Sequence, residues 1–135
     1  MSRSGIAEFT YDALTGEAVK LPFATFETVP VDVNGDAIHE LIRRTPDGRS
    51  ELIDRRGEVL GDFGRNVRGV LACKLLARPG EQILSYNPEG QVYVWYDANA
   101  QDTPAAQARY NHPLYRANRR LGATGSNRCV LGGIY

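Results

Sequence analysis

The sequence predicts an all-β chain that forms part of a β-propeller, about two and a half four-stranded blades, followed by one short helix and an irregular C-terminal tail. Three observations predict this fold. Short β-branched and aromatic runs recur at regular intervals, turns rich in Gly and Pro separate them, and the pattern repeats along the chain. With 135 residues, 42% of them hydrophobic and 24% charged, the chain is long enough for one core. It has no apolar run near the ~20 residues that span a membrane.

The predicted strands are short, and each is bounded by turn residues. Asp12 to Gly16 forms the turn of a first hairpin, and Pro46-Asp47-Gly48 and Pro88-Glu89-Gly90 are hairpin turns because proline presets φ and glycine accepts a positive φ. In chain order the predicted strands are Ile6–Tyr11, Glu17–Leu21, Ala24–Val31, His39–Thr45, Ser50–Asp54, Glu58–Phe63, Val70–Leu76, Gln82–Tyr86 and Gln91–Tyr96.

An internal repeat appears when the sequence is shifted by 42 residues against itself, and we call this shift the repeat offset. It aligns Leu41-Ile42 with Ile83-Leu84, Pro46-Asp47-Gly48 with Pro88-Glu89-Gly90, and Leu52-Ile53 with Val94-Trp95. A period of roughly 40–50 residues with four short strands is typical of a propeller blade. The repeat divides the chain into a partial blade (1–22), a blade (23–64) and a blade with the tail (65–135).

So few blades cannot close a ring, which takes roughly 4–8 of them. We therefore expect the remaining blades to belong to a longer chain. A plain β-sandwich is the alternative fold.

The C-terminal part changes character after Asp97. Thr103 can cap a helix that has Pro104 at its first position, so a short helix is expected up to Arg109. The tail from Tyr110 to Tyr135 is rich in Arg, Asn and Gly, with a last strand candidate at Cys129–Ile134. Cys73 and Cys129 lie in apolar surroundings and are expected to be buried thiols or to form one bridge.

The charges balance overall but not along the chain. Sixteen basic residues face sixteen acidic ones, so a nucleic-acid binder held by overall charge is not expected. Residues 1–62 carry twelve acids and seven bases, a net of −5, whereas residues 63–135 carry four acids and nine bases, a net of +5. The segment from Arg109 to Tyr135 has five Arg and no acid.

The strongest local motif is the loop from Asp32 to Glu40. Oxygen-bearing groups stand at positions 1, 3, 5, 7 and 9, which is the ligand set that Ca²⁺ requires from a tight loop. The predicted metal ligands are Asp32, Asn34, Asp36, the Ile38 carbonyl and Glu40. A polar turn without an ion is the alternative. Imidazole suits Ca²⁺ poorly, so His39 within the loop is expected to point to solvent.

A second candidate site lies in the tail. His112, Tyr115 and Arg116 combine a guanidinium that pairs with carboxylates and two side chains that can transfer a proton. These residues are predicted to contact a polyanion. The alternative is a structural tail, in which the arginines pair with acids of residues 1–62 and hold the sheets together.

These motifs together resemble the C-terminal blades of calcium-dependent rhamnogalacturonan lyases built on an eight-bladed propeller. The resemblance rests on the Asp32–Glu40 loop, which is similar to FG-GAP-type calcium loops, on the stretch from Lys74 to Tyr86, and on the tail, His112 to Arg116 and Gly125-Ser126-Asn127. It covers residues 24–135 in patches. The tail departs from the family at Asn111-His112, Ser126 and Arg128, where the family has His-Asp, Tyr and Gln.

The resemblance implies the C-terminal part of a lyase that cleaves an acidic polysaccharide by β-elimination. In that chemistry the uronate carboxylate is neutralised by Ca²⁺ or Arg, which acidifies the proton at C5 before a base removes it. No residue here matches a family base, so this chain alone is expected to be inactive. The parent protein would be extracellular or periplasmic, although the segment Met1 to Glu8 has no apolar signal core.

Two other functions remain open at this stage. One is a non-enzymatic, calcium-stabilised propeller for carbohydrate binding or adhesion, since a fold alone does not determine function. The other is a complete small β domain of unknown role. Neither a membrane nor a nucleic acid is expected as a partner.

Overall fold

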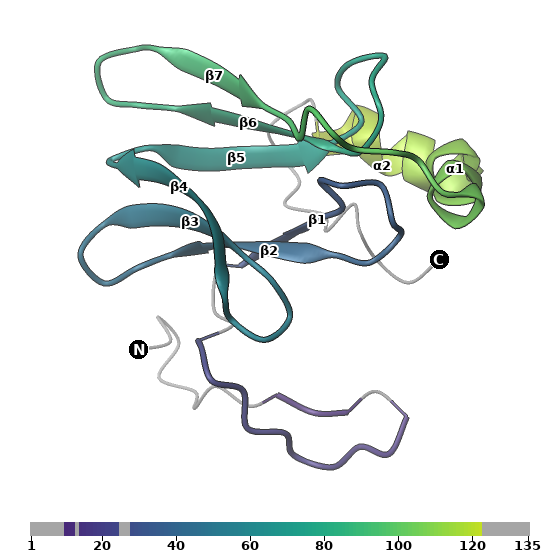
Figure 1. Cartoon of the computed structure of the whole chain (residues 1–135), viewed down its shortest axis with the longest axis horizontal. Helices are drawn as coiled ribbons and strands as arrows, with labels where there is room; N and C mark the ends of the chain where they lie inside the picture. Colours follow the sequence, from purple (N-terminus) through teal and green to yellow (C-terminus); the bar gives the residue numbers. More distant parts are fainter. Residues whose placement is uncertain (1–9, 13, 25–27, 123–135) are drawn as a thin grey trace.

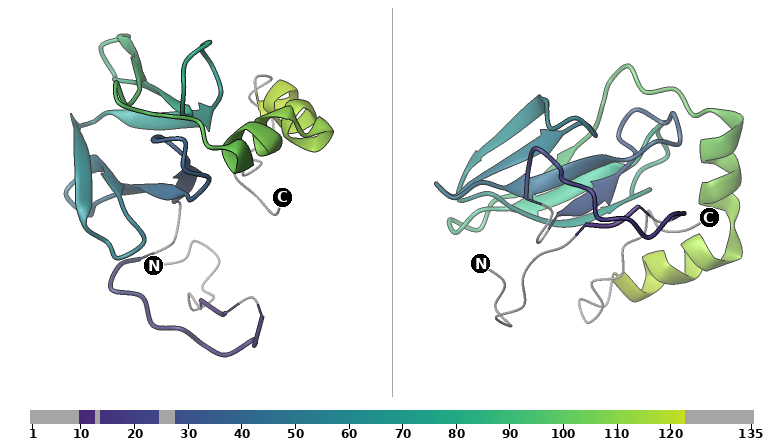
Figure 2. Two further views of the ribbon diagram at one scale, coloured as in Figure 1. Left: turned by 45° about the vertical axis from the view of Figure 1, so that its right-hand side comes forward. Right: turned by 90° about the horizontal axis from the view of Figure 1, so that it is seen from below.

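A computed structural model describes residues 10–12, 14–24 and 28–122. This part of the chain forms two antiparallel sheets and a helical segment, which lies at one end of the sheets (Figures 1 and 2). The all-β prediction is therefore confirmed. The described residues form no closed barrel or closed propeller. Neither helix of the described part is long and apolar enough to cross a membrane.

The first sheet is a four-stranded meander in the order β1-β2-β3-β4. Its strands are β1 (Val29–Val31), β2 (Glu40–Arg44), β3 (Arg49–Ile53) and β4 (Val59–Arg65). The last three agree with the predicted strands to within two residues. β1 is shorter than the predicted strand Ala24–Val31, of which residues 25–27 lie outside the described part. Residues 49–65 pair with two register shifts, which bend this edge of the sheet.

The second sheet has three strands in the order β5-β6-β7. They are β5 (Arg68–Cys73), β6 (Gln82–Tyr86) and β7 (Val92–Trp95). β6 has the predicted bounds. β5 ends at Cys73 and not at Leu76 as predicted, because the backbone amides of Leu75 and Leu76 bond to the Gln82 side chain and not to a neighbouring strand.

The two turns related by the repeat offset have the same backbone hydrogen bonds, a pattern that the β3–β4 turn at Asp54 to Glu58 also shows. In the β2–β3 turn, Thr45 N donates to Arg49 O and Gly48 N donates to Thr45 O. In the β6–β7 turn, Asn87 N donates to Gln91 O and Gly90 N donates to Asn87 O, which are the positions reached by the repeat offset. Gly48 and Gly90 both have a φ of 85°, which the turn requires and which glycine adopts without strain.

The two sheets pack face to face and enclose the main hydrophobic core. Val31, Ile42 and Leu52 project from the first sheet, and Ala72 and Ile83 project from the second; all five are at most 8% exposed. Trp95 packs edge-on against Phe63 with ring centroids 5.1 Å apart and donates from its indole nitrogen to Ser85 Oγ. Each sheet therefore buries one alternating set of side chains against the other.

The helical segment differs from the prediction. α1 (Pro104–Asn111) starts as expected, because Thr103 Oγ1 accepts from Ala106 N and proline stands in the first turn. A second helix, α2 (Pro113–Gly122), replaces the first part of the predicted irregular tail. His112 is extended and separates the helices, and its Nδ1 accepts from Leu114 N at the start of α2. The Arg, Ala and Leu residues of α2 are good helix formers.

Other predictions concern the chain ends. The Asp12 to Gly16 turn is present: Asp12 Oδ1 accepts from Leu14 N and Thr15 N, and a bridge joins Tyr11 to Ala18. Residues 6–9 of the first predicted strand and the candidate strand Cys129–Ile134 lie outside the described residues. Cys73 is a buried free thiol whose pKa is raised to about 12, chiefly by burial.

Replacing a core residue between the sheets should destabilise the chain strongly. Ile83 is 1% exposed and lies between both sheets, so Ile83→Ala should lower the free energy of unfolding by about 2–5 kcal/mol. Leu60→Ala is the control, because Leu60 is 56% exposed, and it should cost under about 1 kcal/mol. Urea unfolding followed by circular dichroism measures both. Equal effects of the two substitutions would contradict this packing.

Candidate functional site

The Asp32–Glu40 loop folds around its own side-chain oxygens. Asp32 Oδ1 accepts from Gly35 N at 2.9 Å and its Oδ2 accepts from Ala37 N at 3.1 Å. Asn34 Oδ1 accepts from Asp36 N, and Asp36 Oδ1 accepts from Ile38 N at 2.6 Å. Short Asp and Asn side chains favour such local turns, which explains why this sequence leaves the β conformation between β1 and β2.

Three of the predicted ligands gather within this loop. Asn34 Nδ2 lies 3.1 Å from Glu40 Oε1 and 3.3 Å from Asp36 Oδ2, so one amide nitrogen sits between two carboxylates. Burial raises the pKa of Glu40 to about 7, although Glu40 Oε2 accepts from Val33 N. Among the residues that the structure describes, no three His, Cys, Asp or Glu side chains form a metal-binding group. A cation here would therefore also need amide and carbonyl oxygens.

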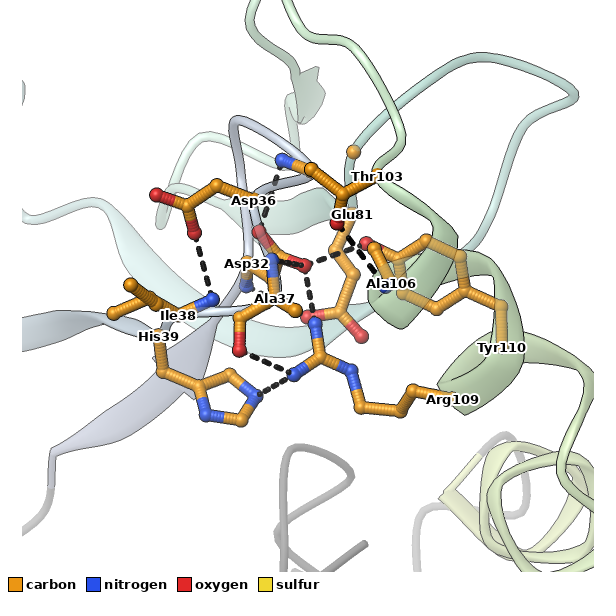
Figure 3. Close-up of polar contacts among 12 residues, drawn as sticks. Asp32, Asp36, Ala37, Ile38, His39, Glu81, Thr103, Ala106, Arg109 and Tyr110 are labelled. Atoms are coloured by element: carbon orange, nitrogen blue, oxygen red, sulfur yellow. Dashed lines mark hydrogen bonds and ion pairs between the residues drawn. The ribbon is translucent and has the colours of Figure 1, made fainter.

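Asp32, the first predicted ligand, is bound by the helical segment. Its side chain is 0% exposed, and its Oδ2 forms an ion pair with Arg109 Nη2 and accepts from the Tyr110 hydroxyl at 2.9 Å (Figure 3). Arg109 Nη1 donates to the Ala37 carbonyl at 3.2 Å. One guanidinium thus neutralises the loop carboxylate and also binds the loop backbone.

His39 does not point to solvent as predicted. Its Nε2 lies 3.1 Å from Arg109 Nη1, and the pKa of the ring is lowered by burial and by the charge of Arg109 (Figure 3). A neutral ring can accept a hydrogen bond from the guanidinium. Arg109 is the reason for this difference. It belongs to α1, so the sequence pattern of the loop does not include it.

A second buried carboxylate lies beside the first. Glu81 is 0% exposed, its Oε2 accepts from Asp32 N at 2.8 Å, and its Oε1 accepts from the Tyr115 hydroxyl at 2.7 Å. Tyr115 is also 0% exposed and its hydroxyl accepts from Lys74 N. Burial raises the pKa of Glu81 and of Tyr115. We call Asp32, Glu81, Arg109, Tyr110 and Tyr115 the buried polar cluster.

Close backbone contacts fix the helices against this cluster. Gln101 N donates to Asn34 O, and Thr103 N donates to Gly35 O. A Cβ atom on Gly35 would lie 2.8 Å from the Gln101 carbonyl oxygen, so this position requires glycine for its contact as well as for its φ of 82°. The segment before α1 is therefore held directly on the loop.

The second repeat has a side-chain ammonium in the corresponding loop. By the repeat offset, Lys74 corresponds to Asp32, and Gly80 corresponds to Ile38. Lys74 Nζ donates to the Gly80 carbonyl at 3.0 Å and to Asp102 Oδ2 at 2.7 Å, and lies 4.4 Å from the centre of the Tyr110 ring. In this loop the carbonyl at position seven, that of Gly80, therefore accepts from the ammonium group of Lys74.

The three residues of the predicted tail site do not lie on one surface. His112 and Arg116 are exposed, whereas Tyr115 points into the buried polar cluster and does not face solvent with them. Arg116 donates to Asn111 Oδ1, and Arg119 donates to the Lys74 carbonyl. With Arg120, these arginines leave α2 a basic outer surface.

A pocket of about 230 Å³ opens between the loop and the β3–β4 turn. Its lining combines acidic and basic side chains, so it could accept a ligand that carries both hydroxyl groups and a carboxylate. The lining residues are Asp36, Ile38, His39, Glu40, Asp54, Arg55 and Arg56.

Sequence reasoning missed most of the buried polar cluster. Glu81, Arg109 and Tyr110 lie 49 to 78 residues from Asp32, so no local motif connects them. One feature of the sequence did indicate a partner for Arg109: its segment is basic and has no acid, whereas residues 1–62 carry a net negative charge. The alternative that tail arginines pair with acids of residues 1–62 is confirmed for Arg109, which pairs with Asp32.

Comparison of this chain with protein-family models, with curated proteins and with solved structures found no significant match.

Removing the guanidinium should leave a buried charge without its counter-ion. Arg109→Met is expected to lower the free energy of unfolding by about 3–5 kcal/mol, because Asp32 stays buried. Arg120→Met removes the same charge from an exposed position of α2 and should change it by under about 0.5 kcal/mol. Chemical unfolding of both variants tests this. Similar midpoints for the two would show that the ion pair is not important for stability.

Removing the ammonium of the second loop should also destabilise the chain. In Lys74→Met, Asp102 loses its ammonium partner and keeps Gly80 N, and the Gly80 carbonyl keeps Gln82 Nε2, at an expected cost of about 1–3 kcal/mol. The control is Lys20→Met at an exposed position. Thermal unfolding with and without Ca²⁺ is the measurement, and the difference in melting temperature between Lys74→Met and the natural chain should be the same in both buffers. A difference that Ca²⁺ abolishes would mean that this loop itself takes a divalent cation.

Proposed function

We propose that this chain is the calcium-binding C-terminal part of a polysaccharide lyase that acts on rhamnogalacturonan, an acidic pectin-type glycan, by β-elimination. The proposal rests on one observation. The ion pair of Arg109 with Asp32 joins the oxygen-rich Asp32–Glu40 loop to a helical segment whose outer surface is rich in arginine. Such an assembly combines a place for a divalent cation with a surface for carboxylates.

The loop fits a calcium ion in the chemistry of its donors. The Asp36 and Glu40 carboxylates converge on the Asn34 amide nitrogen, and a cation would take the place of that donor; the Ile38 carbonyl belongs to the same turn. Asp32 Oδ1 accepts from Gly35 N, while the guanidinium and the tyrosine hydroxyl bind its Oδ2. Carboxylate, amide and carbonyl oxygens are the ligands that Ca²⁺ takes. When bound, Ca²⁺ would supply positive charge that keeps the Glu40 carboxyl ionised despite its burial.

The proposal includes a propeller fold, and the arrangement of the two sheets supports it. Both sheets are antiparallel meanders, of four and three strands, and the turns β2–β3 and β6–β7 are related by the repeat offset. In this reading β1–β4 is one blade, and β5–β7 with the helices is a second blade that carries the C-terminal segment. The remaining blades would come from a longer chain.

The basic surface of α2 would bind the uronate carboxylates. Guanidinium groups pair with carboxylates in a planar, two-bonded arrangement, and Arg116 and Arg120 are exposed on successive turns of the helix. Pairing withdraws charge from the carboxylate and favours loss of the neighbouring C5 proton. His112 is exposed beside Arg116. Tyr115 would act by holding α2 on Glu81.

A non-enzymatic glycan-binding or adhesion protein, stabilised by calcium, is the second candidate. It is favoured by the composition of the helices, since α1 and α2 offer arginines but no Asp or Glu that could serve as a base. Binding of an acidic polysaccharide needs only the basic surface.

Calcium should stabilise the folded chain. A cation that binds only the folded state adds about 2.7 kcal/mol at a hundredfold excess over its Kd, so the melting temperature should be higher in Ca²⁺ than in chelator. Asp36→Ala should remove this difference. Asp47→Ala, which removes an exposed acid of the β2–β3 turn, should keep it. Scanning calorimetry of the three chains decides, and equal melting of the natural chain in both buffers would refute the calcium site.

Acidic glycan should bind to the basic surface. Titration calorimetry with rhamnogalacturonan oligosaccharides should show affinity that falls about tenfold or more in Arg116→Ala combined with Arg120→Ala, and that weakens with added salt. Arg56→Ala in the β3–β4 turn is the control for charge, and neutral galactan is the control for the carboxylate. Equal binding of galactan would contradict the proposal. The chain alone should form no unsaturated uronate, because the remaining blades are missing; calcium-dependent product formation by the isolated chain would contradict the proposal that it is part of a longer lyase.

A further inference from the structure

We propose that Arg109 and Ca²⁺ compete for Asp32, so that calcium binding to the Asp32–Glu40 loop and docking of α1 oppose each other. The competition concerns the calcium loop of the proposed function and rests on that function. It makes the calcium affinity of the loop depend on a residue of the helical segment. Because coupling between two binding events is reciprocal, calcium in turn weakens the hold of α1 on the loop.

The carboxylate of Asp32 accepts about as many hydrogen bonds as its lone pairs allow. A carboxylate has about four lone-pair sites. Asp32 accepts from Gly35 N at 2.9 Å, from Ala37 N at 3.1 Å, from the Tyr110 hydroxyl at 2.9 Å and from Arg109 Nη2, and the last three bind Oδ2. A cation that binds Oδ2 must displace a donor. A cation that binds Oδ1 must share one buried negative charge with the guanidinium.

The donors that come from α1 can leave more readily than those of the loop. Gly35 N and Ala37 N belong to the turn that the Asp32 side chain closes, so their hydrogen bonds are part of the loop fold. Arg109 and Tyr110 are neighbours on α1 and reach the loop from that helix (Figure 3). They can therefore be displaced together while the loop stays folded.

Arg109 serves the loop as its cation. Its Nη1 donates to the Ala37 carbonyl while its Nη2 pairs with Asp32. The side chain is only 6% exposed, and within the described part of the chain its buried Nε has no hydrogen-bond partner. A buried donor without a partner costs free energy. The docked guanidinium is therefore not fully satisfied, which favours its exchange for a metal ion.

The second repeat shows a loop in which such an exchange is blocked. Lys74 stands at the position of Asp32, and its Nζ donates to the Gly80 carbonyl and to Asp102 Oδ2. The cation of this loop is attached to the loop itself, and no carboxylate is left at that position for a metal ion. In the first loop the carboxylate is present and its cation comes from another element, so the cation can be exchanged.

Displacement of Arg109 would loosen α1 without detaching α2. Tyr115 donates to Glu81, and Arg119 donates to the Lys74 carbonyl. Neither contact uses Asp32. The basic surface of α2 would therefore stay at the end of the sheets when calcium binds.

Titration calorimetry of the full chain with CaCl₂ tests the competition. Arg109→Met should bind Ca²⁺ about tenfold or more tightly than the natural chain, within the range of roughly 5–150-fold that coupled sites show. Tyr110→Phe keeps the ring but removes a donor from Asp32, so it should also bind more tightly, and it remains informative if Arg109→Met does not fold. Tyr93→Phe is the matched control. Its hydroxyl bonds to residues of the β6–β7 turn, so its loss should leave the affinity unchanged.

Hydrogen exchange on the natural chain measures the docking of α1 directly. The amides of α1 should exchange faster in Ca²⁺ than in chelator, because the helix loses its contacts with Asp32. The amides of β2 and β3 should not exchange faster. Slower exchange of α1 in Ca²⁺ would overturn the competition, because it would mean that calcium and the helix support each other.

The outcomes of the titrations separate the competition from the calcium site itself. Binding by the natural chain with the same affinity in Arg109→Met and Tyr110→Phe would overturn the competition and leave the calcium site intact. Absence of binding in all three chains would overturn both. Binding by the two variants but not by the natural chain would support the competition, and it would show that the natural loop holds its arginine in place of a metal ion.

Discussion

The ion pair between Asp32 and Arg109 holds the parts of this protein together. It joins a loop of the first sheet to α1, and both side chains are nearly inaccessible to water. A buried carboxylate without a counter-charge would be very costly, so the helix must stay where its guanidinium reaches the loop. Glu81 and Tyr115 extend the same constraint to the second sheet and α2. Three parts of the chain that are far apart in sequence, the Asp32 loop, Glu81 and the helical segment, are thereby placed at one end of the sheets.

The β1–β2 and β5–β6 loops both lie at this end, and a different basic side chain donates to the inward-facing carbonyls of each. Each connects the first and second strands of a repeat and turns its backbone carbonyls inward. In the second loop Lys74 satisfies the carbonyl of Gly80. In the first loop Arg109 satisfies the carbonyl of Ala37, while Asp36 and Glu40 add negative charge beyond what one guanidinium balances. This surplus of oxygens is the reason why the proposed cation is assigned to the first loop and not to the second.

The repeat also explains why the molecule has both a core and an open apolar face. Both sheets carry apolar side chains on both faces: Ile42 and Ile53 lie on opposite faces of the first, and Ile83 and Leu84 on opposite faces of the second. One face of the first sheet is covered by the second sheet, whereas the second sheet has its own face over β6 and β7 exposed. In the proposed propeller, the next sheet of the longer chain would cover this exposed surface.

The sequence by itself determined the local structure. The Pro-Asp-Gly and Pro-Glu-Gly turns, the alternation of the strands and the cap at Thr103 depend on interactions within a few residues, so their positions could be predicted. Only the tertiary structure decided that Asp32 meets Arg109, that Tyr115 turns inward to Glu81, and that residues 113–122 form a helix against the sheets. These depend on which distant surfaces pack together. A periodic pattern does not contain that information, because one acid-rich loop can be neutralised by a metal ion or by any distant basic side chain.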